Sequence, residues 1–345
     1  LDNLDQALAS TLKSLELKPD NPDALLNLGG IYKDLGNLDQ ALSSTLKSLE
    51  LKPDHPDALI NLGGIYKDLG KLDQALEATL KSLEIEAGNA RALYNLNAFI
   101  DQLILSPINA KNLIKAYELL INLDNISHKK LFRIFLQLFL PTIQIAAKSD
   151  PIIAANNNSL NHLASDWRLR KSLTLFTPPN REVEHFLTRL RKELLILAAN
   201  KNSISEHLKP LIESLATQCF LNEYVYAQSP EEEDLVDRLI HSTSENQESL
   251  NQYLAILACY TPIHQLNMNQ EWLKHYPTSS EESRALIQSQ LEEPQEEERI
   301  KASIQSDSSI NDTVSLKVQD MYEENPYPRY RYADHTDKSL AKTPS

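Results

Sequence analysis

The first third of the chain repeats itself every 34 residues, and this periodicity constrains the fold more than any other feature. Residues 1–34 and 35–68 differ at only four positions, and residues 69–102 are a third copy that diverges from position 85 onward. Each copy contains two stretches with helical spacing of apolar residues, and a proline follows the second stretch. One such helix pair cannot bury its apolar face alone, so successive pairs are expected to stack into a solenoid.

The pattern inside each copy resembles the tetratricopeptide repeat. A Leu-Gly pair is followed by tyrosine in the first helix, alanine occupies the second helix, and proline comes after it. In one copy these residues are Leu28, Gly29, Tyr32, Ala41 and Pro53. The resemblance covers residues 1–102 and implies a right-handed superhelix whose concave groove binds a protein or peptide. We expect the small residues to serve close helix packing.

The chain starts within a repeat, because Leu1 aligns with Leu35. The position of Leu35, between the two helices of its copy, predicts that the chain opens on a second helix. A missing first helix would leave apolar surface uncovered, which natural solenoids avoid. We therefore expect the natural protein to extend further towards its N-terminus.

An asparagine recurs at the same place in the first helix of successive copies, at Asn27, Asn61 and Asn95. Stacked copies would align these amides into a ladder, and an amide can both donate to and accept from a peptide backbone. The repeats are similar to those of O-linked N-acetylglucosamine transferases, in which an asparagine ladder holds substrate polypeptide. The alternative is that the identity reflects recent duplication. Chaperone-binding repeats hold their ligand with a two-carboxylate clamp. In this chain, only Lys33 and Lys67 suit such a clamp.

Beyond the repeats, helical spacing continues without convincing strand-like alternation, so the sequence predicts an all-α chain. The predicted helices are 112–122, 130–140, 183–199, 205–218 and 250–259. The most apolar stretch, residues 131–147, is too short for a membrane span and is predicted to be a buried helix broken near Pro141. The predicted domains are the repeats at 1–102, a helical domain at 103–280, an acidic linker or exposed helix at 281–312, and an extended lead-in segment at 313–345.

Composition excludes several classes of function. A net charge of −14 argues against nucleic acid as a partner. The basic region at residues 168–192 is expected to be a solvated helix surface paired with glutamates. None of the seven glycines lies beyond Gly88, so the rest of the chain has no glycine-rich phosphate or dinucleotide loop. No catalytic or metal-ligand spacing is found, and Cys219 and Cys259 are expected to be core thiols in a reducing cytoplasm.

Two regions carry a second resemblance. Residues 219–226 and 257–263 are apolar segments for which core packing is the default interpretation. They also resemble the helical region of bacterial proteins in which tetratricopeptide repeats precede a class I methyltransferase domain. The segment 322–330 resembles the lead-in to that domain, although the family usually has tryptophan where this chain has Tyr330. Its prolines fix an extended course, which predicts docking against a following domain. The residues expected to dock are Tyr322, Tyr327, Arg329 and Tyr330.

The sequence thus predicts a chain that binds and does not catalyse. The methyltransferase resemblance implies that it is the recruiting N-terminal part of a parent enzyme that uses S-adenosylmethionine, with no cofactor bound by these residues. The alternative is a stand-alone interaction scaffold without enzymatic activity. A glycosyltransferase fusion is a third option that rests on the repeats alone. We expect a cytoplasmic protein with a protein or peptide partner, and with neither nucleic acid nor membrane as a partner.

Overall fold

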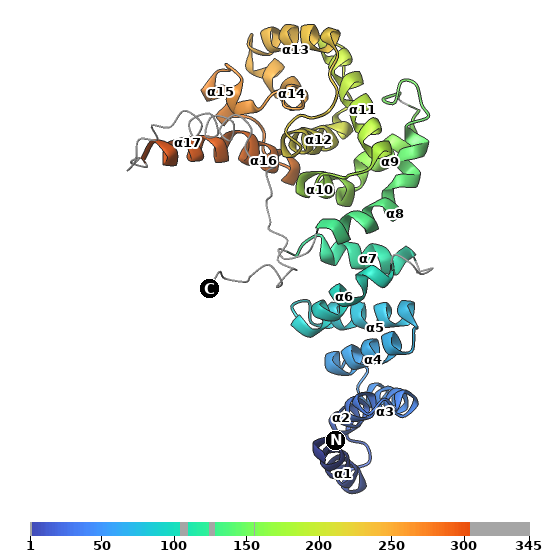
Figure 1. Cartoon of the computed structure of the whole chain (residues 1–345). Helices are drawn as coiled ribbons and strands as arrows, with labels where there is room; N and C mark the ends of the chain where they lie inside the picture. The colour runs from blue at the N-terminus through green and yellow to red at the C-terminus, as the bar shows by residue number, and fades with distance from the viewer. Residues whose placement is uncertain (1, 104–109, 124–127, 155, 304–345) are drawn as a thin grey trace, which may run out of the picture. The chain divides into compact units, whose positions relative to one another are not determined.

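The structure is a computed structural model that describes residues 2–103, 110–123, 128–154 and 156–303. Within these ranges every regular element is a helix, which confirms the predicted all-α class (Figure 1). The chain divides into two compact units, Leu1–Ile126 and Ser127–Ser345, which we call unit 1 and unit 2.

Unit 1 is the helix-pair solenoid that the repeat predicts. Its helices are α1 (Asp2–Leu17), α2 (Pro22–Asp34), α3 (Leu38–Leu51), α4 (Pro56–Asp68), α5 (Leu72–Ile85), α6 (Ala90–Leu103) and α7 (Ala110–Leu120). Helix α2 packs against α3 and α4 against α5, and each pair packs against the next. Proline occupies the first turn of α2 and of α4, where its missing N–H costs nothing. Gly36 and Gly70 adopt positive φ angles of 77° and 73° in the turns between paired helices.

Close packing within each pair depends on small residues, as the sequence predicts. A Cβ on Gly29 would lie 2.2 Å from Thr45 Oγ1 and 3.2 Å from the carbonyl oxygen of Ala41. The corresponding distance between a Cβ on Gly63 and Thr79 Oγ1 is 2.6 Å. Neither space admits a larger residue without movement of the neighbouring helix or side chain.

The structure divides the chain at residue 126, further on than the expected boundary at 102. Helix α7 packs against α5 and therefore belongs to unit 1. Its inward-facing Leu113, Ala116, Tyr117 and Leu120 are all buried. The residues of α7 no longer match the 34-residue pattern. They retain an apolar face, which packs against α5. Sequence identity between copies thus ended before the solenoid did.

Unit 2 is a second, non-repetitive helical domain. Its helices are α8 (His128–Ala146), α9 (Asn158–Ser165), α10 (Trp167–Leu175), α11 (Arg181–Ala199), α12 (Lys209–Leu221), α13 (Pro230–Thr243), α14 (Gln247–Leu257), α15 (Gln270–Lys274), α16 (Glu281–Ile287) and α17 (Glu293–Ser303). Short 3₁₀ turns lie at Glu206–Leu208 and Ile263–Gln265, and a π-helical turn at Gln288–Glu292 joins α16 to α17.

Helix α12 forms the centre of unit 2. Every residue from Leu211 to Leu221 is buried, and α10, α14 and α16 pack around it (Figure 1). A helix that is buried on all sides shows little separation into an apolar and a polar face, because no face meets water. Cys219 on α12 and Cys259 after α14 are both free and buried, which confirms the expected core thiols.

The apolar stretch around Pro141 forms one helix, so the expected break is wrong. Helix α8 continues through the proline to Ala146. Phe139 and Ile143 are buried on one side, whereas Pro141 is exposed on the other. A proline on the solvent side leaves the neighbouring carbonyl accessible to water, and packing on the opposite side holds the helix together. No helix within the described ranges is long and apolar enough to cross a membrane.

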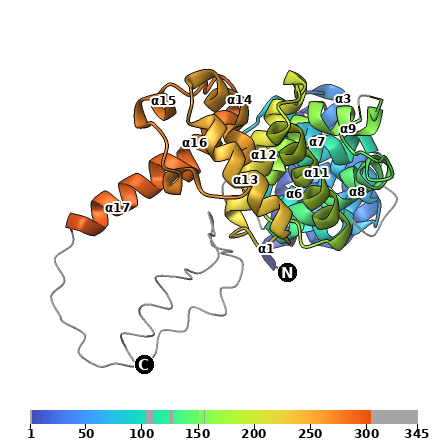
Figure 2. The same ribbon diagram turned by 90° about the horizontal axis from the view of Figure 1, so that it is seen from above.

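The segment expected to be an acidic linker or exposed helix is partly core. Helix α16 packs against α12, with Leu286 fully buried, and Gln290 in the π-helical turn is fully buried as well. Gln290 Nε2 donates to the carbonyl oxygens of Ala216 and Ala258, at 2.8 and 3.2 Å. Only α17, which extends away from the rest of unit 2 in Figure 2, has the expected exposed and glutamate-rich character.

The basic region of residues 168–192 largely pairs with acidic residues, as expected. Arg170 Nε donates to Glu282 Oε1 at 2.5 Å, and Lys171 pairs with Glu281. Arg191 is the exception, because only 1% of its side chain is exposed and it is not part of a solvated surface.

The Arg191 guanidinium occupies a buried polar pocket that its backbone acceptors create. It lies 4.4 Å from the ring centroid of Tyr260, and its Nη2 donates to the carbonyl oxygen of Ala227 at 2.8 Å. Glu232 Oε1 is 4.0 Å away and accepts from the Tyr260 hydroxyl at 3.0 Å. The acceptor carbonyl oxygens lie in the segments that follow α12 and α14. One arginine satisfies several of them at once.

Candidate peptide-binding groove

The candidate site lies along the first helices of successive repeats. Helix α2 packs against α4, and α4 against α6, so residues 34 positions apart occur along one side of the stack. Of the predicted asparagine ladder, Asn27 is exposed, whereas Asn61 and Asn95 are half-buried. Partial burial limits the motion of the last two amides while leaving them accessible to a ligand.

A cavity of about 420 Å³ lies at α4 and α6, next to the end of α2. Four of the five residues predicted to bind peptide line it, and Asn27 does not. The lining residues that carry polar or aromatic groups are Lys33, Asn61, Lys67, Asp68, Arg91, Tyr94 and Asn95. Two of the three predicted ladder asparagines and both predicted lysines therefore line one cavity.

Helix packing determines the position of Asn61. Its Nδ2 donates to Thr45 Oγ1 at 3.3 Å, and Thr45 is fully buried beside Gly29. The hydroxyl of Thr45 thus orients the amide from the preceding helix pair. Among the described residues, Asn61 Oδ1 has no hydrogen-bond donor, which leaves this oxygen as an acceptor for a ligand.

A glycine on the next helix positions Lys33. A Cβ on Gly64 would lie 3.2 Å from both Cε and Nζ of Lys33, so the lysine side chain lies along α4 where a larger residue would displace it. Lys33 Nζ is 3.9 Å from Asp68 Oδ2. This separation is too long for a hydrogen bond, and the half-exposed pair contributes little to stability.

Lys67 is the equivalent lysine one repeat later, and its environment differs. The position that corresponds to Asp68 is Gln102 in the next copy, so the repeat offers no equivalent carboxylate. Within the described part of the chain, no acidic side chain pairs with Lys67. Lys67 therefore lines the cavity without an ion-pair partner among the described side chains.

Sequence reasoning missed two groove residues, Arg91 and Tyr94. Arg91 Nη1 pairs with Asp57 Oδ1 at 2.9 Å, and Tyr94 is 74% exposed. The signal that could have found them is the departure of the third copy from the other two. Arg91 stands where the earlier copies have aspartate, and Tyr94 stands where they have leucine or isoleucine.

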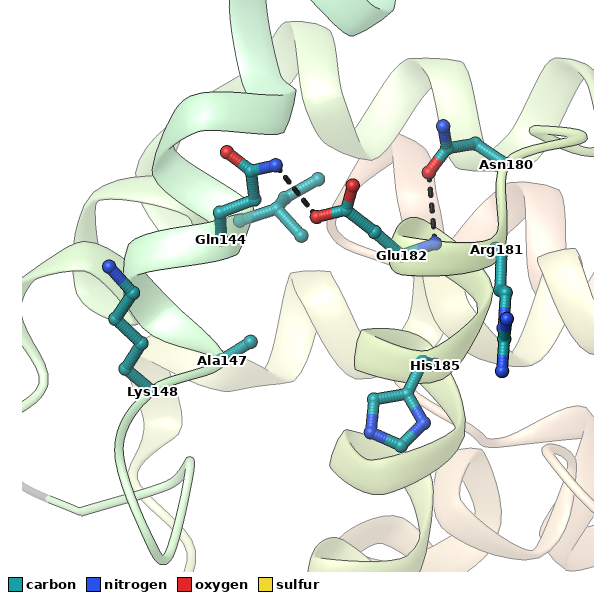
Figure 3. A pocket seen from close by; sticks show the side chains of 8 residues that line it. Gln144, Ala147, Lys148, Asn180, Arg181, Glu182 and His185 are labelled. Carbon is teal, nitrogen blue, oxygen red and sulfur yellow. Dashed lines mark hydrogen bonds between the residues drawn. The ribbon is translucent and has the colours of Figure 1, made fainter.

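Unit 2 has a cavity of about 800 Å³ between the end of α8 and the beginning of α11 (Figure 3). Gln144 Nε2 donates to Glu182 Oε2 at 2.7 Å across it. Asn180 Oδ1 accepts from the backbone N–H of Glu182 at 3.0 Å and so occupies the start of α11. Lys148 and His185 point in different directions in Figure 3, so they do not converge on a common ligand position.

The predicted docking residues Tyr322, Tyr327, Arg329 and Tyr330 lie outside the described residues. In the described ranges, no group of three or more His, Cys, Asp or Glu side chains is placed to hold a metal ion. The groove of unit 1 is thus the site at which predicted functional residues meet.

A comparison with protein families supports the repeat class of unit 1. The tetratricopeptide repeat model matches residues 11–43 and 45–77, which lie in α1 to α5. A search of curated proteins gave no match to this chain. Together with the helical solenoid, the family match supports tetratricopeptide repeats in unit 1, and such repeats suggest a protein-interaction module.

Proposed function

We propose that unit 1 binds an extended polypeptide in the groove formed by α4 and α6. The observation that carries the proposal is that Asn61 and Asn95 line the same cavity as Lys67. A side-chain amide pairs with the N–H and C=O groups of an extended backbone whatever its sequence, and the lysine adds attraction for carboxylates or carbonyl oxygens. Asn27 would extend the same contact surface along α2.

The test is binding of the full chain to an array of immobilised 15-residue peptides of diverse sequence. We expect the double variant Asn61→Ala and Asn95→Ala to lose about tenfold or more in affinity for the peptides that wild type retains, since each lost amide removes hydrogen bonds. Asn37→Ala is the matched control, because Asn37 is exposed, lies outside the cavity and makes no capping bond. Equal binding by the double variant and wild type would refute the proposal.

A finer proposal concerns the parent protein. The resemblance of residues 219–226 and 322–330 to repeat-containing class I methyltransferases supports a role as the recruiting region of such an enzyme. The alternative is a stand-alone scaffold in the cytoplasm. Reading the source DNA past the codon for Ser345 separates the two, because an open frame that enters a strand and a glycine-rich turn supports the enzyme. A stop codon there would support the scaffold.

We also expect that residues 1–345 do not bind S-adenosylmethionine by themselves. The class I fold needs a glycine-rich loop after its first strand, and no glycine follows Gly88 in this chain. Calorimetric titration of the chain with S-adenosylmethionine is expected to give no heat of binding. Micromolar affinity would contradict this prediction.

A further inference from the structure

The charge of the groove differs in sign from that of the chain. The whole sequence carries a net charge of −14, yet Lys33, Lys67 and Arg91 line the cavity with Asp68 as the one acidic lining residue described. Lys33 is near Asp68, and Arg91 pairs with Asp57 through an exposed and therefore weak ion pair. Lys67 has no such partner among the described residues, so the groove attracts a negatively charged ligand.

Tyr94 adds an aromatic surface directly beside these cations. Tyr94 and Asn95 follow Arg91 by three and four residues on α6, a spacing that places each of them beside Arg91 on the helix surface. The equivalent Ile60 in the preceding repeat is only 3% exposed, whereas Tyr94 is 74% exposed. An exposed tyrosine at this position contributes little to the core, but it offers a ring face and a hydroxyl to a ligand.

We propose that the groove selects an acidic extended peptide in which a carboxylate side chain is next to an aromatic or other large apolar side chain. This inference rests on the proposed peptide-binding function and adds the chemistry of the ligand. Lys67 and Arg91 attract the carboxylate, and Tyr94 contacts the neighbouring apolar side chain. Asn61 and Asn95 hold the backbone between them. Arg91 and Tyr94 are positions at which the third repeat departs from the other two, and Lys67 comes from the second repeat.

The experiment measures fluorescence anisotropy of the full chain with four labelled 12-residue peptides, each acetylated and amidated to remove terminal charges. One repeats glutamate, tyrosine, glutamate and serine. Two others replace each glutamate by glutamine or by lysine, and the fourth replaces each tyrosine by alanine. We expect the glutamate–tyrosine peptide to bind about tenfold tighter than the glutamine peptide, and its affinity to fall between 50 mM and 500 mM salt as screening increases.

Two variants with matched controls assign the effect to residues. Lys67→Glu is expected to abolish the preference for glutamate over glutamine, whereas Lys81→Glu, an exposed charge reversal on α5 outside the cavity, retains it. Tyr94→Ala is expected to abolish the preference for tyrosine over alanine, and Tyr94→Phe to retain it. Circular dichroism of each variant verifies that the helices are intact.

The outcomes separate the two proposals. Equal binding of the glutamate, glutamine and lysine peptides, with loss on Asn61→Ala and Asn95→Ala, would overturn the selectivity and leave peptide binding in place. Tighter binding of the lysine peptide would also overturn it. Absence of binding by any peptide, in both this assay and the array, would overturn the peptide-binding function and the inference that rests on it.

Discussion

At the scale of single residues, unit 1 uses glycine for space between helices as well as for backbone freedom in its turns. Two adjacent glycines on α2 have different environments. A Cβ on Gly29 would lie 2.2 Å from Thr45 Oγ1, whereas a Cβ on Gly30 would have no heavy atom within 4 Å. The same residue type therefore carries opposite consequences at neighbouring positions.

This difference predicts opposite effects for two otherwise identical substitutions. Gly29→Ala is expected to lower the free energy of unfolding by about 1–3 kcal/mol, because the buried Thr45 must move. Gly30→Ala is expected to raise it by roughly 0.5–1 kcal/mol, since alanine favours the helix over glycine. Urea titrations of both variants give the two values. A stabilised Gly29→Ala variant would mean that the helices can separate at little cost.

The buried Arg191 is expected to be costly to replace, because a buried cation is removed from its acceptors. Arg191→Met would remove the donor to several buried backbone carbonyl oxygens and one of the two cations near the Glu232 carboxylate, and we expect a loss of about 3–5 kcal/mol. The control is Lys192→Met, because Lys192 is half-exposed and 3.7 Å from the same carboxylate. That change is expected to cost less than about 1 kcal/mol. Similar losses for both variants in urea unfolding would contradict this assignment.

At the scale of elements, helix packing in unit 2 relies on polar side chains that hold irregular segments. Glu213 on α12 accepts from the hydroxyls of Tyr276 and Ser280, both at 3.1 Å. These hydrogen bonds hold the segment before α16 against α12. The ammonium of Lys209 lies 5.4 Å from the Tyr276 ring centroid, and Glu282 adds a nearby negative charge.

Burial raises the pKa of the Glu213 carboxyl above its usual value of 4.5. The folded state therefore holds this proton more tightly than the unfolded state. The stabilisation from this group is complete below pH 4.5 and is lost as pH rises through the raised pKa of the folded state. We expect the free energy of unfolding of wild type, relative to Glu213→Gln, to decrease as pH increases over this range. A difference independent of pH would show that the carboxyl titrates alike in both states.

At the scale of the whole molecule, the chain divides into two compact units. Gly29 belongs to unit 1 and Arg191 to unit 2. Substitutions without shared neighbours act independently on stability. The amide protons of each unit should therefore respond only to changes within that unit.

Hydrogen exchange read by mass spectrometry tests this independence in the full chain. Gly29→Ala is expected to speed exchange in peptides from α2 to α5, and Arg191→Met in peptides from α11 to α14. In the double variant, both patterns should appear unchanged. Faster exchange in α11 to α14 of the Gly29→Ala variant would indicate that the units unfold together.

The sequence by itself determined the solenoid, because near-identical repetition every 34 residues requires each helix pair to meet its neighbour in the same way. Apolar spacing also located α8, α11 and α14, whose boundaries lie within a few residues of those expected, apart from the later end of α8. The same spacing could not show that Pro141 leaves α8 intact. A helix can continue through a proline that lies on its solvent side when the opposite side packs against the core, and only the structure shows which side that is.

Only the tertiary structure decided which polar residues are buried and which groove residues converge. Arg191 and Lys192 are adjacent, yet one has 1% of its side chain exposed and the other 46%, because only Arg191 faces the carbonyl oxygens of distant turns. Likewise, the repeat predicted Asn61 and Lys67, but it gave no weight to Tyr94. That ring is exposed in the folded unit although the equivalent Ile60 is buried, and tertiary packing decides such differences between residues at the same place in the repeat.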